Sequence, residues 1–208
     1  KENIGFTMNL MSGFASALTI SFMYWSIVLI LNKVILDKLK ADVLSQKRKL
    51  QISGAAVIGS LSFTFTDTFW FSAVETEVYA MATLIMAILF YLGLRWETSR
   101  TFARRSYEMH EPRRNKWLLL ICFVIGLSFG VHFMGLLAIP ALVMIYYFKN
   151  QKSILNSTKV NPILGFFIAN VIGLAILMGV FKLLLPNTLK FFSAIELLFV
   201  NNLGLPFN

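Results

Sequence analysis

The sequence predicts an all-α protein: a polytopic bundle of transmembrane helices with about six spans in this chain. Three observations predict this fold class. The composition is 57% hydrophobic and 14% charged, well above the roughly 45–50% apolar usage of soluble domains, and the mean hydropathy is +0.71. The apolar residues come in blocks long enough to span a bilayer. The basic residues gather in short segments between these blocks.

Each apolar run of roughly 17–25 residues is expected to cross a hydrocarbon core of about 30 Å as one helix. The block Trp117–Phe148 has 32 residues and would be about 48 Å long as a single helix. Because that length is too great for one crossing, we expect two helices, broken around Gly130-Val131-His132. The expected spans cover residues 9–31, 52–71, 77–95, 117–131, 133–148 and 161–185.

The whole chain, residues 1–208, is expected to form a single transmembrane domain. Residues 186–208 space apolar side chains at helical intervals, with Lys190 and Glu196 between them, which favours an extracytoplasmic tail lying along the membrane interface. The chain begins at Lys1 and ends at Asn208 without a polar tail. We therefore expect a fragment of a longer protein.

The basic residues predict the orientation of the chain. Sixteen of the 19 Lys and Arg residues lie in three loops, at 32–51, 95–116 and 149–160. With six spans these loops share one side, and the positive-inside rule makes that side cytoplasmic. The net charge of +9 therefore has a topological cause and does not indicate nucleic-acid binding. The single cysteine, Cys122, excludes a disulfide framework and a cysteine-based metal site.

Ionisable residues within apolar sequence mark a candidate site at the predicted extracytoplasmic ends of the spans. Such groups are costly at membrane depth and are functional candidates for that reason. Carboxylates and an imidazole suit general acid or base work, or the binding of a divalent cation. No metal-ligand spacing, phosphate loop or nucleophile elbow is present, so no cofactor is predicted. The candidates are Asp67, Glu75, Glu77 and His132.

Structural explanations compete with function at most of these positions. Ser72-Ala-Val-Glu75 has the pattern of a capping box, in which Glu75 would bond to the amide of the capping residue. Glu77 lies two residues further, about 200° round a helix, so the same cap does not explain it, and it is the strongest catalytic candidate. Asp67 has the alternative explanation of a solvated turn residue.

His132 and two aromatic residues have structural explanations of their own. His132 follows Gly130 in the tight break, where a histidine often bonds to the free carbonyls of a helix end. Trp70 and Tyr79 are typical of the aromatic belt at a membrane interface.

Several motifs in order along the chain carry a family resemblance. They are Phe69-Trp-Phe-Ser-Ala-Val-Glu-Thr-Glu-Val-Tyr-Ala80, Arg95-Trp-Glu97, Gly126-Leu-Ser-Phe-Gly-Val-His132, Leu137-Ala-Ile-Pro-Ala141 and, more weakly, Asn201-Asn-Leu-Gly-Leu-Pro-Phe-Asn208. The set resembles a bacterial multi-pass membrane family, formerly of unknown function, that is related to protein O-mannosyltransferases. A vertebrate membrane O-mannosyltransferase is similar across the same region.

The resemblance implies a GT-C superfold glycosyltransferase in the bacterial inner membrane. Such an enzyme takes a sugar from a polyprenyl-phosphate carrier and transfers it to a protein hydroxyl or glycan acceptor on the extracytoplasmic face, in contact with membrane lipid. In the family the main catalytic acid lies in a first extracytoplasmic loop, which is expected upstream of Lys1. The implied roles are catalytic for Glu77, Asp67 and Glu75, and substrate-binding for His132, Trp70 and Tyr79.

Two other classes of protein stay open. A transporter or flippase-like protein would use the acidic residues to relay protons or bind a substrate. The sequence has no inverted repeat and only short turns on one side, which counts against that class. A structural membrane subunit without catalytic activity is the third interpretation.

Overall fold

The structure, a computed structural model, describes residues 2–41, 43–75, 78–103, 112–158, 160–204 and 206. Every element in these ranges is helical, which confirms the predicted all-α class. The elements are α1 (Glu2–Leu39), α2 (Gln46–Thr64), α3 (Asp67–Val74), α4 (Val78–Ala103), α5 (Pro112–Ser128), the 3-10 helix η1 (Phe133–Leu137), α6 (Ala138–Thr158), α7 (Pro162–Gly179), the π-helix η2 (Val180–Leu184) and α8 (Leu185–Leu203).

Four helical stretches among the described residues are long and apolar enough to cross a membrane. They are Asn3–Leu39, Val78–Thr98, Phe133–Gln151 and Pro162–Leu203. The protein is therefore a multi-pass helical membrane protein. The expected crossing at 117–131 falls on a shorter apolar helix, Lys116–Ser128, and the one at 52–71 falls on α2, which is less apolar than α1. The count of six spans stays a prediction.

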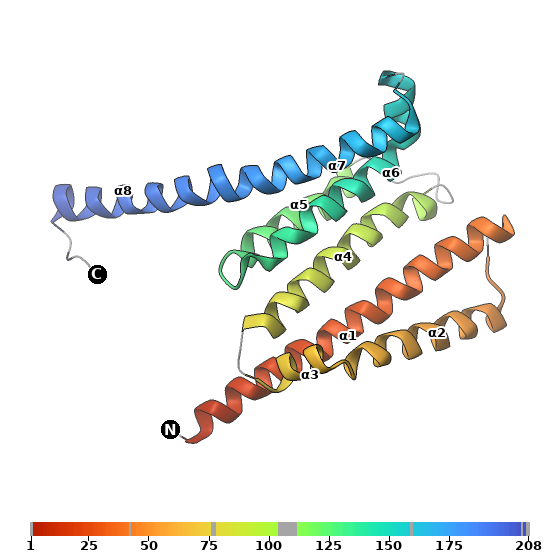
Figure 1. Cartoon of the computed structure of the whole chain (residues 1–208), viewed down its shortest axis with the longest axis horizontal. Coiled ribbons are helices and arrows are strands. Elements are labelled where there is room, and N and C mark those ends of the chain that lie inside the picture. Colours follow the sequence, from red (N-terminus) through yellow and green to blue (C-terminus); the bar gives the residue numbers. More distant parts are fainter. Residues whose placement is uncertain are drawn as a thin grey trace.

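Successive long helices run in alternating directions between two ends of the bundle (Figure 1). At one end α1, α4 and α6 finish and α2, α5 and α7 begin. We call this the basic end, because Lys38 lies in the last turn of α1 and Lys47, Arg48 and Lys49 lie at the start of α2. The opposite end carries α3, the start of α4 and the break between α5 and α6 (Figure 1). Segments far apart in the sequence thus meet at each end.

The break in the long apolar block lies where the sequence predicts it. α5 ends at Ser128, whose carbonyl oxygen accepts from the backbone N–H groups of Val131 and His132 at 3.1 and 2.9 Å. η1 and α6 then lead back toward the basic end (Figure 1). The reversal is tight, because a Cβ atom at Gly135 would lie 2.6 Å from the Cβ of fully buried Ser128. Glycine is needed for this close approach.

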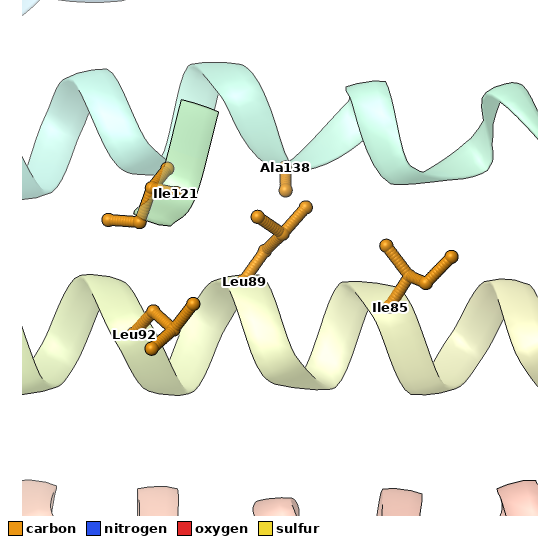
Figure 2. Close-up of a cluster of buried hydrophobic side chains, with 5 residues drawn as sticks. All are labelled: Ile85, Leu89, Leu92, Ile121 and Ala138. Atoms are coloured by element: carbon orange, nitrogen blue, oxygen red, sulfur yellow. The ribbon is translucent and has the colours of Figure 1, made fainter. Parts of the chain in front are cut away.

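α4 is the central helix and packs against α1, α5 and α6. A buried apolar cluster joins it to α5 and α6, made of Ile85, Leu89, Leu92, Ile121 and Ala138 (Figure 2). On the side of α1, buried Ala15 meets Ala80 and Leu84. Small residues at such contacts let helix backbones approach closely, which is how helices associate in lipid.

The structure contradicts the capping-box interpretation of Ser72. Ser72 lies inside α3, and its hydroxyl donates to the carbonyl oxygen of Thr68 at 3.0 Å. α3 begins earlier, at Asp67, after Thr66, whose backbone is extended and whose side chain makes no capping hydrogen bond. Glu75 is at the other end of the helix, where its backbone N–H donates to the carbonyl oxygen of Phe71 at 3.0 Å.

The last apolar segment also continues further than expected. Its helical backbone runs from Pro162 to Leu203, past residue 185, where the span was expected to end. A proline inside a helix clashes with the carbonyl four residues earlier, which for Pro186 belongs to Lys182. Lys182 lies in the π-helical turn η2, and this wider turn is a known site of helix adjustment. The interfacial position of the tail at 186–208 stays a prediction.

Candidate functional site

Two of the predicted site residues, Tyr79 and His132, are in contact at the end opposite the basic end. Tyr79 is the second residue of α4, and His132 immediately precedes η1. Their ring centroids lie 5.6 Å apart with an interplanar angle of 57°. Tyr79 is 44% exposed and His132 is half-buried. The pair is therefore accessible from the surface of the bundle, where a substrate could reach it.

His132 caps the N-terminus of η1. Its backbone is extended, with φ −164° and ψ 142°, and its Nδ1 accepts from the backbone N–H of Met134 at 3.1 Å. This differs from the expectation that His132 would bond to free carbonyls. Because Nδ1 accepts a hydrogen bond, the proton of the neutral imidazole is on Nε2. His132 therefore presents an N–H donor, which suits a phosphate or another oxygen anion.

Asp67 begins α3 and Glu75 follows its last residue, at the same end of the bundle as Tyr79 and His132 (Figure 1). Asp67 is the first residue of α3, where a carboxylate is favoured by the helix dipole. Both side chains are exposed. Among the described residues, no hydrogen bond or ion pair joins either carboxylate to His132. The structure places them at one end of the bundle without bringing them into contact.

Trp70 packs within its own corner of the chain. It stacks on Phe65, just after the end of α2, with ring centroids 6.5 Å apart and an interplanar angle of 14°. Half of its side chain, 51%, stays exposed. An exposed indole at the end of apolar helices fits the aromatic belt of a membrane interface.

Glu77 lies outside the described residues, together with Thr76. In the sequence it falls between Glu75, which follows the last residue of α3, and Val78, the first residue of α4. Within the described ranges no group of three or more His, Cys, Asp or Glu residues has the geometry of a metal site.

The motif Arg95-Trp-Glu97 has a structural role that sequence reasoning missed. It lies on α4 at the basic end, and each of its residues contacts a different helix. Arg95 lies over the ring of Trp117 in α5. Lys149 of α6 lies over the ring of Trp96 and donates to the carbonyl oxygen of Trp96. Glu97 forms an ion pair with Lys33 of α1. The motif thus joins α4 to its three neighbours. No local pattern indicates these contacts, because the partners are distant in the sequence.

Fold and site together define a multi-pass helical membrane protein whose candidate polar site lies at one end of its helices. Residues 1–155 match the family model of the protein O-mannosyl-transferase TMEM260 N-terminal domain. The chain belongs to this family, which makes it an O-mannosyltransferase-like membrane glycosyltransferase at the family level. Searches of curated proteins and of solved structures found no significant match.

Proposed function

We propose that this chain is the membrane part of a GT-C-type glycosyltransferase, which moves a sugar from a polyprenyl-phosphate carrier to a hydroxyl acceptor outside the cytoplasm. The contact between Tyr79 and His132 carries the proposal. It joins two of the motifs at the end opposite the basic end, in a chain that belongs to an O-mannosyltransferase family. An N–H donor and several carboxylates at one end of the bundle are the groups that this reaction needs.

The chemistry assigns a role to each group. A carboxylate, Glu77 in this proposal, takes the proton of the acceptor hydroxyl while the hydroxyl oxygen forms a bond to C1 of the sugar. The bond between C1 and the phosphate oxygen breaks, and the lipid phosphate leaves with the bonding electron pair. His132 stabilises the departing phosphate by donating from Nε2. Asp67 and Glu75 bind the acceptor.

Aromatic side chains complete the proposed substrate site. Tyr79 lies against His132, so its ring is placed beside the sugar or the phosphate. Trp70 presents an exposed indole at the same end of the bundle, where the isoprenoid chain of the carrier would enter from the lipid.

Thiol labelling in intact cells tests the orientation on which the proposal depends. In a Cys122→Ser background, Gly130→Cys should react with an impermeant thiol reagent, and Ser45→Cys should not. The reason is that position 45 precedes α2 at the basic end, whereas position 130 lies in the break between α5 and α6. A permeant reagent should label both and serves as the control. Labelling of position 45 with position 130 protected would reverse the orientation.

Reconstitution tests the activity itself. The complete protein in proteoliposomes, supplied with polyprenyl-phosphate mannose carrying a radiolabel, should produce a labelled serine- or threonine-containing peptide. Protein-free liposomes are the control. Movement of the lipid-linked sugar across the bilayer without any transfer to the peptide would contradict the proposal and favour the flippase-like class.

A further inference from the structure

A groove of about 400 Å³ lies near the basic end, between α1, α4 and α6. α4 forms its floor, because α1 and α6 both pack on α4, which lies between them (Figure 1). Most of the lining is apolar, namely Leu29, Ile30, Val34, Leu94, Ile145 and Phe148. Four polar side chains, Lys33, Asp37, Glu97 and Thr98, complete it. The groove therefore combines an apolar wall with a charged end, as a phospholipid does.

We propose that this groove binds a membrane phospholipid whose headgroup carries a primary amine. The charges of the lining determine the headgroup. Lys33 is already neutralised by its ion pair with Glu97, whose side chain is only 17% exposed. Asp37 is exposed and has no ion-pair partner among the described residues. The lining thus has one uncompensated negative charge, which an ammonium group balances.

Hydrogen bonding separates a primary amine from choline. A primary ammonium carries three N–H donors, whereas the quaternary ammonium of choline has none. The carboxylate of Asp37 accepts such bonds. The hydroxyl of Thr98 also accepts, because its own proton is donated to the carbonyl oxygen of Leu94 at 3.0 Å. An ethanolamine headgroup is therefore expected to donate to both Asp37 and Thr98, which line the same groove.

An anionic headgroup fits the groove less well. Such a headgroup carries no ammonium group to balance the carboxylate of Asp37, so its net negative charge adds to that of the groove. The depth is right for a headgroup, since Lys33 and Glu97 lie close to the ends of the apolar stretches Asn3–Leu39 and Val78–Thr98. The site lies at the opposite end from Tyr79 and His132, so this inference does not depend on the proposed reaction.

Native mass spectrometry of the complete protein tests the headgroup preference. Phosphatidylethanolamine, phosphatidylcholine and phosphatidylglycerol with identical acyl chains are the probes. Phosphatidylethanolamine should bind more tightly than either of the others, by up to about fivefold, which is the upper limit for one exposed charge pair. Asp37→Asn should abolish this preference. Glu196→Gln, which removes a carboxylate from α8 outside the groove, is the matched control and should preserve it.

Two further variants test the location. Leu94→Trp fills the groove and should remove the bound lipid, and Ile30→Trp, at an already exposed position, does the same if Leu94→Trp fails to fold. Leu119→Trp, on an exposed side chain of α5 outside the groove, is the control.

Glu97→Gln frees Lys33 and should shift the preference toward phosphatidylglycerol. Equal binding of the three lipids to the natural protein, or a preference that survives Asp37→Asn or the tryptophan that folds, would overturn the proposal.

Discussion

Replacement of His132 by asparagine is expected to lower sugar transfer by about 10²- to 10³-fold without reducing the amount of folded protein in the membrane. The Oδ1 atom of asparagine can take the place of Nδ1 and accept the backbone N–H of Met134. The variant keeps the cap of η1 but lacks the Nε2 donor. Loss of one donor aimed at developing negative charge typically costs a factor of that size. Transfer rates of the purified variant measure the effect.

His132→Gln is the matched control, because its amide nitrogen lies near the position of Nε2 while the acceptor at Nδ1 is lost. This variant should keep more activity than His132→Asn. It should also melt at a lower temperature, since loss of a capping acceptor costs about 1 kcal/mol. Transfer rates and thermal unfolding of the two variants are to be compared side by side. The opposite order of activities would mean that His132 serves only to cap η1.

Replacement of Glu77 by glutamine is expected to reduce transfer by about 10²-fold or more, the low end of what a positioned general base contributes. The amide keeps the shape of the side chain but does not accept a proton from the acceptor hydroxyl. The loss should appear in kcat more than in KM, because the base acts in the transition state.

The matched control for Glu77 is its neighbour Glu75. Glu75 follows the last residue of α3 and has an exposed side chain, so Glu75→Gln removes a carboxylate of the same segment without disturbing a buried contact. Because Glu75 is proposed to bind the acceptor, Glu75→Gln should raise the KM for the acceptor and leave kcat nearly unchanged, whereas Glu77→Gln should lower kcat. A normal rate for Glu77→Gln would place the general base elsewhere.

Properties that depend on chain length and composition were predictable from the sequence. The break before His132 is the clearest case, because 32 apolar residues exceed one crossing and Gly130 weakens a helix. The basic segments were expected at one end because helices that alternate in direction bring every second loop to the same side. The sequence also predicted that Tyr79 and His132 lie at the same end of the bundle. It did not predict that their rings are in contact.

Contacts between distant residues were not predictable in this way. The ion pair of Lys33 with Glu97 joins positions 64 residues apart, and no periodicity within one helix indicates it. Ser72 shows a different difficulty: its pattern with Glu75 matches a helix start, but α3 begins at Asp67, so the serine lies inside the helix.

The arrangement of α4 has a consequence for the membrane itself. Tyr79 and Glu97 are 18 residues apart on this one helix, which is about 27 Å along its axis. That distance nearly equals the thickness of the hydrocarbon core, about 30 Å. α4 therefore holds the contact of Tyr79 with His132 near one membrane surface and the contacts of the Arg95-Trp-Glu97 motif near the other. In a thinner bilayer the helix must tilt to keep both ends at their surfaces, so the position of Tyr79 in the proposed site is linked to the thickness of the surrounding membrane.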